Sequence, residues 1–124
     1  MSWDIFVSRV EGEWIFTNED LQAFLEAEIN LGHWVCIEDQ ISFSGRIYDD
    51  LLFQITGQSL FSSWTPPARV KEIYNMFMRC DPQEEIRKYK YNDNDHFKFS
   101  VENIRELRKF FRVCAERDLG LIGD

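Results

Sequence analysis

The sequence predicts an α+β fold in which a mainly antiparallel sheet of four to six strands carries three helices on one face. Three observations lead to this class. Short apolar runs typical of strands cluster in residues 1–60, segments of helical periodicity occur in both halves of the chain, and strand–helix–strand units are too few for a doubly wound parallel sheet. With 124 residues, of which 44% are hydrophobic, the chain is expected to form a single domain over residues 1–124.

The first half of the chain contains the expected strands. They share short apolar runs bounded by turn-forming residues, and they lie at residues 3–7, 14–16, 33–37, 41–44 and 51–56. The first two flank a turn at Glu11-Gly12 and predict an N-terminal hairpin. The other three predict a meander, with turns at Glu38-Asp39-Gln40 and Tyr48-Asp49-Asp50.

Apolar residues spaced three or four apart predict helices at about 18–31, 68–80 and 101–117. Thr17 and Ser100 are expected N-caps, because a hydroxyl at that position accepts an otherwise unpaired backbone N–H. Pro67 can open the second helix, and Gly32 suits the end of the first. The polar segment 83–95 is expected to be a loop or a short exposed strand.

The sequence also limits the compartment. No apolar run approaches the roughly 20 residues of a membrane-spanning helix, and the N-terminus lacks the basic region of a signal peptide, so a cytoplasmic protein without membrane contact is expected. Cys36, Cys80 and Cys114 are 44 and 34 residues apart, which matches neither a disulfide framework nor a metal-binding pair. We expect these thiols to be reduced, packed and unreactive.

Residues suited to catalysis are scarce. Neither His33 nor His96 belongs to a recognisable motif, and His33 and Cys36 would point to opposite faces of a strand. The oxygen-rich run 92–95 before His96 lacks the glycine and the distal glutamate of a calcium loop. Nucleotide-binding, zinc-protease and serine-hydrolase motifs are missing from the sequence. The protein is therefore expected not to be an enzyme and to use no metal or other cofactor.

The excess negative charge lies in the first half of the chain. Residues 1–60 hold eleven acids and two bases, net −9, whereas residues 61–124 hold eleven acids and twelve bases, net +1. Such asymmetry either draws the two halves together or leaves an acidic surface for a partner. The predicted turns containing Glu38-Asp39 and Asp49-Asp50 fall at opposite ends of the meander, so a patch at one end needs further acids. The candidates are Glu11 and Glu13, the acids Glu19 and Glu26 of the first predicted helix, and the neighbours of Asn30.

Two large amphipathic side chains lie near these turns and are candidate anchors for a partner, because buried aromatic rings carry much of the binding energy of interfaces. These side chains are Trp64 and Tyr48. The alternative is that Trp64 packs in the core and Tyr48 lies on the surface without binding a partner. The candidate partner-binding residues are Glu38, Asp39, Tyr48, Asp49, Asp50 and Trp64.

A basic stripe recurs at helical spacing on the last predicted helix and consists of Arg105, Arg108, Lys109 and Arg112. Such a stripe can bind nucleic acid, but a net charge of −8 opposes attraction to phosphates. Glu102 and Glu116 lie at the spacing that allows ion pairs with this stripe. We expect a solvated or internally paired face and no direct contact with nucleic acid.

The stretches MSWDIFVSR, FTNEDLQAFLEAEI and FSVENIRELRKFFRVCAERDLGLIG give the chain a resemblance to small acidic immunity proteins of bacterial toxin systems, including contact-dependent growth inhibition. The resemblance implies a monomer or weak dimer that inhibits a cognate toxin stoichiometrically, the toxin often being a nuclease. A nuclease that holds phosphates is basic, so an acidic inhibitor would complement it. The residues themselves leave two alternatives open: a non-enzymatic adaptor or regulatory protein-binding domain, and a small enzyme with an unrecognised site.

Overall fold

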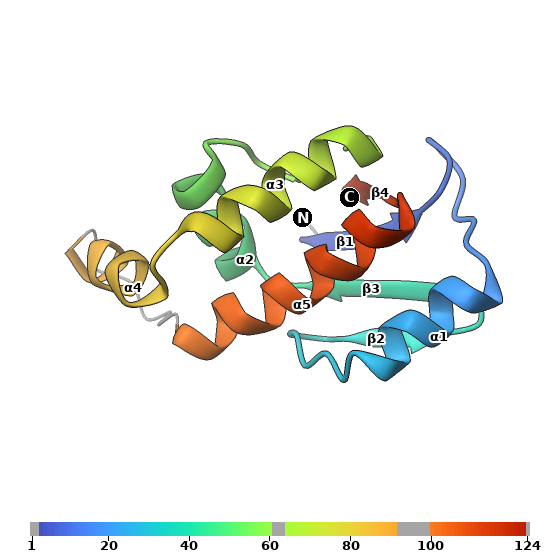
Figure 1. Cartoon of the computed structure of the whole chain (residues 1–124), viewed down its shortest axis with the longest axis horizontal. Coiled ribbons are helices and arrows are strands. Elements are labelled where there is room, and N and C mark those ends of the chain that lie inside the picture. Colours follow the sequence, from blue (N-terminus) through green and yellow to red (C-terminus); the bar gives the residue numbers. More distant parts are fainter. Residues whose placement is uncertain (1–2, 61–63, 92–99, 124) are drawn as a thin grey trace.

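The computed structural model describes residues 3–60, 64–91 and 100–123 (Figure 1). Within these residues the chain is α+β, with one antiparallel sheet of four strands and five helices. The elements, in chain order, are β1 (Asp4–Ser8), α1 (Asn18–Glu26), β2 (Val35–Ile37), β3 (Gln40–Ser44), α2 (Arg46–Thr56), α3 (Pro67–Arg79), α4 (Pro82–Tyr91), α5 (Val101–Arg117) and β4 (Gly120–Gly123).

The sheet has the strand order β2-β3-β1-β4, and every neighbouring pair is antiparallel. The first and last strands of the chain therefore lie side by side, with Phe6 opposite Ile122. Beyond β4, the backbone of Thr65 exchanges two hydrogen bonds with Leu121, at 2.8 and 2.9 Å. These bonds cover part of the edge of β4, whereas β2 forms the other edge of the sheet.

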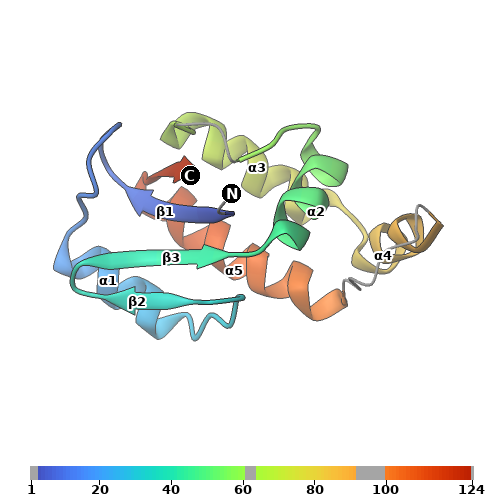
Figure 2. The same ribbon diagram turned by 180° about the vertical axis from the view of Figure 1, so that it is seen from behind.

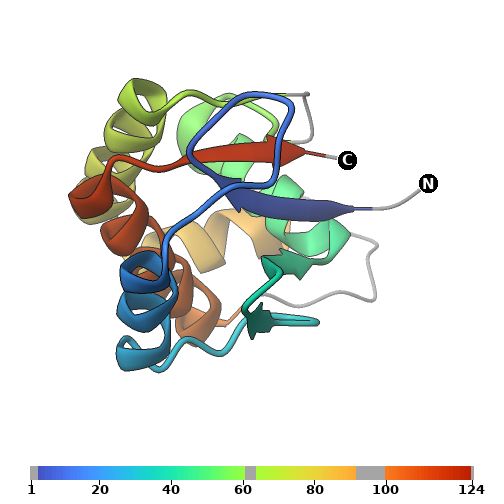
Figure 3. The same cartoon turned by 90° about the vertical axis from the view of Figure 1, so that its right-hand side faces the viewer.

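Three helices, α1, α3 and α5, lie on one side of the sheet, and the other side is open in the view from behind (Figures 2 and 3). The core lies beneath α5, where the ring of Phe110 contacts the rings of Phe24, Phe43 and Phe111 at centroid distances of 5.6, 5.0 and 5.4 Å. All four rings are fully buried, and each contributes roughly 2 to 3 kcal/mol of apolar burial. The expected placement of helices on one face is confirmed for these three elements.

Several expected elements are confirmed. The second and third predicted helices correspond to α3 and α5, and α5 covers the predicted range 101–117. Thr17 and Ser100 are the N-caps of α1 and α5, and each accepts a hydrogen bond from the backbone N–H three residues later. In return, the side-chain oxygens of Asp20 and Asn103 accept from the backbone N–H groups of Thr17 and Ser100, which completes two capping boxes.

The predicted third strand of the meander is wrong, because residues 51–56 form the second half of α2. Tyr48, Leu51 and Leu52 recur at helical spacing and are buried on one face of this helix. The turn predicted at residues 48–50 is therefore the first half of α2. The short run of apolar residues fits a strand and a buried helix equally well, so its period could not separate the two.

The segment 83–91 was expected to be irregular but belongs to α4, and its continuation at 92–95 lies outside the described residues. This helix has a mostly polar sequence and is supported by ion pairs one turn apart. Arg87 approaches Glu84 at 3.1 Å and Lys88 approaches Glu85 at 3.4 Å. Apolar periodicity was too weak to indicate a helix of this kind.

The predicted N-terminal hairpin and the end of α1 also need correction. Residues 14–16 form a loop and no strand, whereas the C-terminal strand β4 was not expected. The helix α1 ends at Glu26 with Ala27 as its C-cap residue, so Gly32 is not its cap. At Gly32 a Cβ atom would lie 2.9 Å from the carbonyl oxygen of Ser44 and 3.2 Å from the ring of Tyr48, and this close approach requires glycine.

A buried carboxylate connects β1, α1 and α5. The side chain of Asp20 is fully buried and accepts two hydrogen bonds from Arg9, each of 2.7 Å, and one of 2.6 Å from Arg117. The backbone N–H of Thr17 donates a further bond of 2.8 Å. Burial alone would raise the pKa of this carboxyl, but the four hydrogen bonds outweigh burial and hold the pKa well below its ordinary range.

Replacing Asp20 with Asn is expected to lower the free energy of unfolding at pH 7 by about 2 kcal/mol, because two guanidinium groups lose their anionic partner. The loss stays modest because the arginine side chains are 34% and 31% exposed and partly screened by water. Urea unfolding followed by circular dichroism measures the change. The control Glu72→Gln removes the exposed pair with Arg69 and should cost less than about 1 kcal/mol.

The same substitution should change the pH dependence of stability. Because the folded pKa of Asp20 is depressed, its contribution is complete above the unfolded pKa of about 4 and is lost as the pH falls through the folded pKa. The stability difference between the native protein and Asp20→Asn should therefore shrink between pH 4 and pH 2.5. A difference that stays constant from pH 7 to pH 2.5 would contradict this assignment.

Candidate protein-interaction site

The structure separates the four predicted binding acids. Glu38 and Asp39 form the exposed turn between β2 and β3. Asp49 and Asp50 lie on α2, which follows the opposite end of β3 (Figure 2). The expectation that the two acidic pairs lie at opposite ends of the sheet is confirmed. Asp49 is half-buried and accepts a hydrogen bond of 2.6 Å from the hydroxyl of Ser59, so it also supports the fold.

The two predicted aromatic anchors have packing roles. Tyr48 is 4% exposed, and its hydroxyl accepts a hydrogen bond of 2.7 Å from the backbone N–H of Gly32. Trp64 is half-buried, and its ring lies so close to Gly120 that a Cβ atom there would be 2.3 Å from it. Tyr48 was expected to be a surface residue, but it belongs to the core. Its ring packs at the start of α2 against Phe43 of β3.

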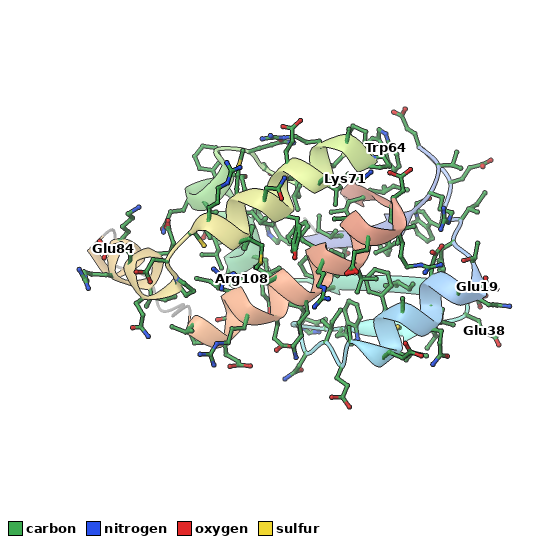
Figure 4. All side chains as sticks on the ribbon, in the orientation of Figure 1. Glu19, Glu38, Trp64, Lys71, Glu84 and Arg108 are labelled. Atoms are coloured by element: carbon green, nitrogen blue, oxygen red, sulfur yellow. The ribbon has the colours of Figure 1, made fainter. Side chains whose placement is uncertain are left out.

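The β2–β3 turn lies at the same end of the molecule as the loop after β1 and the start of α1 (Figures 1 and 3). Five exposed carboxylates of the described chain belong to these three segments. We call this set the acidic end, and it consists of Glu11, Glu13, Glu19, Glu38 and Asp39. Figure 4 shows Glu19 and Glu38 at this end and Glu84 at the opposite end. Arg9 lies in the same loop, but its guanidinium is engaged by Asp20.

Exposed apolar side chains accompany these acids. The indole of Trp14 is 58% exposed and stacks on the ring of Phe6 at a centroid distance of 4.5 Å, and Ile37 is 56% exposed. A narrow crevice is lined by Phe6, Trp14, Asp39 and Gln40, among others, which places the indole beside the acidic turn. The sequence contained a signal for this site, because Trp14 directly follows the acidic turn Glu11-Gly12-Glu13. Trp14 was not predicted as a binding residue because residues 14–16 were assigned to a strand.

The loop that carries Trp14 is held in place by backbone and side-chain hydrogen bonds. The buried hydroxyl of Ser8 donates to the carbonyl oxygens of Val10 and Glu13 and accepts from the N–H of Ile15 at 3.2 Å. The N–H of Arg9 donates to the carbonyl oxygen of Ile15 at 2.7 Å. The structure thus presents Trp14 from a well-bonded loop, and a partner would need to order few groups on binding.

The basic stripe on α5 is internally paired, as expected. Arg105 approaches Glu102 at 3.6 Å, and Arg112 approaches Glu116 at 2.8 Å. The remaining two cations also have partners: Lys109 pairs with Glu106, and Arg108 donates to the carbonyl oxygens of Phe77 and Cys80. A groove of about 530 Å³ between α1 and α5 is bordered by this stripe. The groove is lined by both acidic and basic side chains, so it should attract a partner of either charge less strongly than the acidic end attracts a basic partner.

Histidine and cysteine side chains are few in the described part of the chain. No set of three His, Cys, Asp or Glu residues there could hold a metal ion, and none of the described helices is long and apolar enough to cross a membrane. His33 is an exposed loop residue, and His96 lies outside the described residues. Burial raises the pKa of Cys36 and Cys80, and raises that of the fully buried Cys114 well above its ordinary value.

The thiols should therefore react slowly with iodoacetamide in the folded protein at pH 7.5, because the thiolate is the reactive form. We expect the rate at Cys114 to fall at least tenfold below its rate in urea, with smaller decreases at the half-buried Cys36 and Cys80. Mass spectrometry of timed digests measures each rate. A thiol that reacts faster in the folded protein than in urea would show an activated cysteine and contradict this interpretation.

Comparisons of the chain with protein-family models, with curated proteins and with solved structures found no match.

Proposed function

We propose that the protein is an immunity protein that binds a cognate toxin, a basic nuclease, and neutralises it stoichiometrically. The acidic end carries this proposal, because its five carboxylates are exposed beside the exposed indole of Trp14. Carboxylates attract a basic surface over a distance, and an aromatic ring supplies the short-range contact that a stable complex needs. The resemblance of the sequence to acidic immunity proteins supports the same function.

The charge distribution fits an inhibitor of a phosphate-binding enzyme. A nuclease holds the phosphates of its substrate with Lys and Arg side chains, and an acidic protein can occupy the same positive surface. The net charge of −8 favours rapid association with such a partner at low ionic strength. Inhibition by occupation requires no reacting group on this chain. A nuclease toxin acts where nucleic acid is exposed, so we place the protein in the cytoplasm.

Co-expression tests the proposal in cells. The product of the open reading frame next to this gene should stop growth when expressed alone and should be harmless when this protein is also produced. The two purified proteins should form a complex of one to one stoichiometry in size-exclusion chromatography with light scattering. A neighbouring product that is harmless alone, or toxic despite this protein, would contradict the immunity function. Adaptor or regulatory binding would then be the better interpretation.

Charge reversal at the acidic end should weaken the complex. In the double variant Glu38→Lys and Asp39→Lys, the association rate constant is expected to fall roughly tenfold or more at low salt, and its salt dependence should decrease. Both side chains are exposed, so the fold should survive. Surface plasmon resonance at several salt concentrations measures both effects.

The matched control carries the same charge change elsewhere. Glu72 and Glu84 are exposed on α3 and α4, and Figure 4 shows Glu84 at the opposite end of the molecule. The double variant Glu72→Lys and Glu84→Lys should retain most of the association rate. Equal losses in both double variants would show that net charge, and not the acidic end, determines binding.

A further inference from the structure

The side of the sheet that faces away from α1, α3 and α5 carries a row of three apolar side chains and one serine. Directly paired residues of antiparallel strands place their side chains on the same face. Val35 pairs with Ser42, Ser42 with Phe6, and Phe6 with Ile122, so these four side chains form one row across all four strands. None of the helices in the described ranges crosses this side of the sheet (Figure 2).

Two strongly exposed side chains extend the row toward the acidic end. Trp14 stacks on Phe6 from the loop after β1, and Ile37 pairs with Gln40 on the same face as Val35. Trp14 and Ile37 are 58% and 56% exposed. We call Phe6, Trp14, Val35, Ile37 and Ile122 the open sheet face. Phe6, Val35 and Ile122 are half-buried and Ser42 is buried, so the exposed apolar area of this face is concentrated at Trp14 and Ile37. An exposed apolar area rimmed by polar residues is typical of a binding site.

Acidic side chains border the open sheet face and identify its occupant. Asp39 lines the crevice with Trp14 and Phe6, Glu38 adjoins Ile37 in sequence, and Glu13 adjoins Trp14. A second copy of this chain would bring the same acids into opposition, and like charges across an interface disfavour association. A partner with apolar side chains flanked by Lys or Arg has the complementary chemistry.

We infer that the open sheet face is a docking surface for a segment of a basic protein, in which an apolar side chain packs against Trp14 and Ile37 while flanking cations face Glu38 and Asp39. The inference deepens the proposed function and rests on it in naming the toxin as the source of that segment. Trp14 is the central anchor, because its large rigid ring is exposed, is held by the stack on Phe6 and comes from a hydrogen-bonded loop.

Selection from a random library of 16-residue peptides displayed on phage tests the docking surface without the toxin. Peptides enriched on the immobilised protein should combine Lys or Arg with aromatic or aliphatic residues. Their affinity, measured by fluorescence anisotropy, should fall at least tenfold for Trp14→Ala and for Ile37→Thr. Ile37→Thr preserves a β-branched side chain in β2, so the strand should be retained. This variant therefore tests the open sheet face even if Trp14→Ala changes the conformation of its own loop.

The control variant Phe53→Ala removes an equally exposed ring, 60% exposed on α2, and should bind the peptides as the native protein does. No enrichment, enrichment of acidic peptides, or unchanged affinity in both Trp14→Ala and Ile37→Thr would overturn the docking surface. The cell assay is independent of this selection. If this protein rescues growth but the peptide results fail, the docking surface is contradicted and the immunity function stands. If the peptide results are as expected but growth is not rescued, the immunity function is contradicted and the docking surface stands.

Discussion

The buried carboxylate of Asp20 is the interaction on which the arrangement of this molecule depends. It joins Arg9 directly after β1, Thr17 at the start of α1 and Arg117 at the end of α5, and Asp20 and Arg117 are 97 residues apart in the sequence. An unpaired carboxylate in this position would be costly, so the three segments must meet in one geometry. The loop with Trp14 lies between the first two and is thereby held against the sheet.

The distribution of ion pairs explains why one end of the molecule stays acidic. Six cations in the described part of the second half pair with an acid on their own helix, as Lys109 does with Glu106 and Arg112 with Glu116. These bases consequently neutralise little of the excess acid in the first half. The uncompensated carboxylates gather where the β2–β3 turn, the loop after β1 and the start of α1 meet. The excess acid of the first half thus becomes a local electrostatic feature of the surface.

Local signals in the sequence were sufficient for α3, α5 and the two N-caps, because periodicity and hydroxyl caps act over a few residues. They failed for α2, whose apolar run 51–56 has no decisive period, and for β4, which exists through its pairing with β1. The acidic turn with Glu38 was predictable from composition. The exposure of Trp14 and the role of Asp20 depend on contacts between distant segments, which no local pattern encodes.

Hydrogen exchange measured by NMR tests most directly whether Asp20 holds the acidic end in a preformed state. The account predicts that Asp20→Asn accelerates exchange at the amides of Arg9 and Ile15, which bond within the loop, much more than at amides in the middle of α3. A uniform acceleration throughout the molecule would reflect global destabilisation only. That result, or unchanged exchange in the loop, would contradict the claim that one buried carboxylate organises the candidate interaction site.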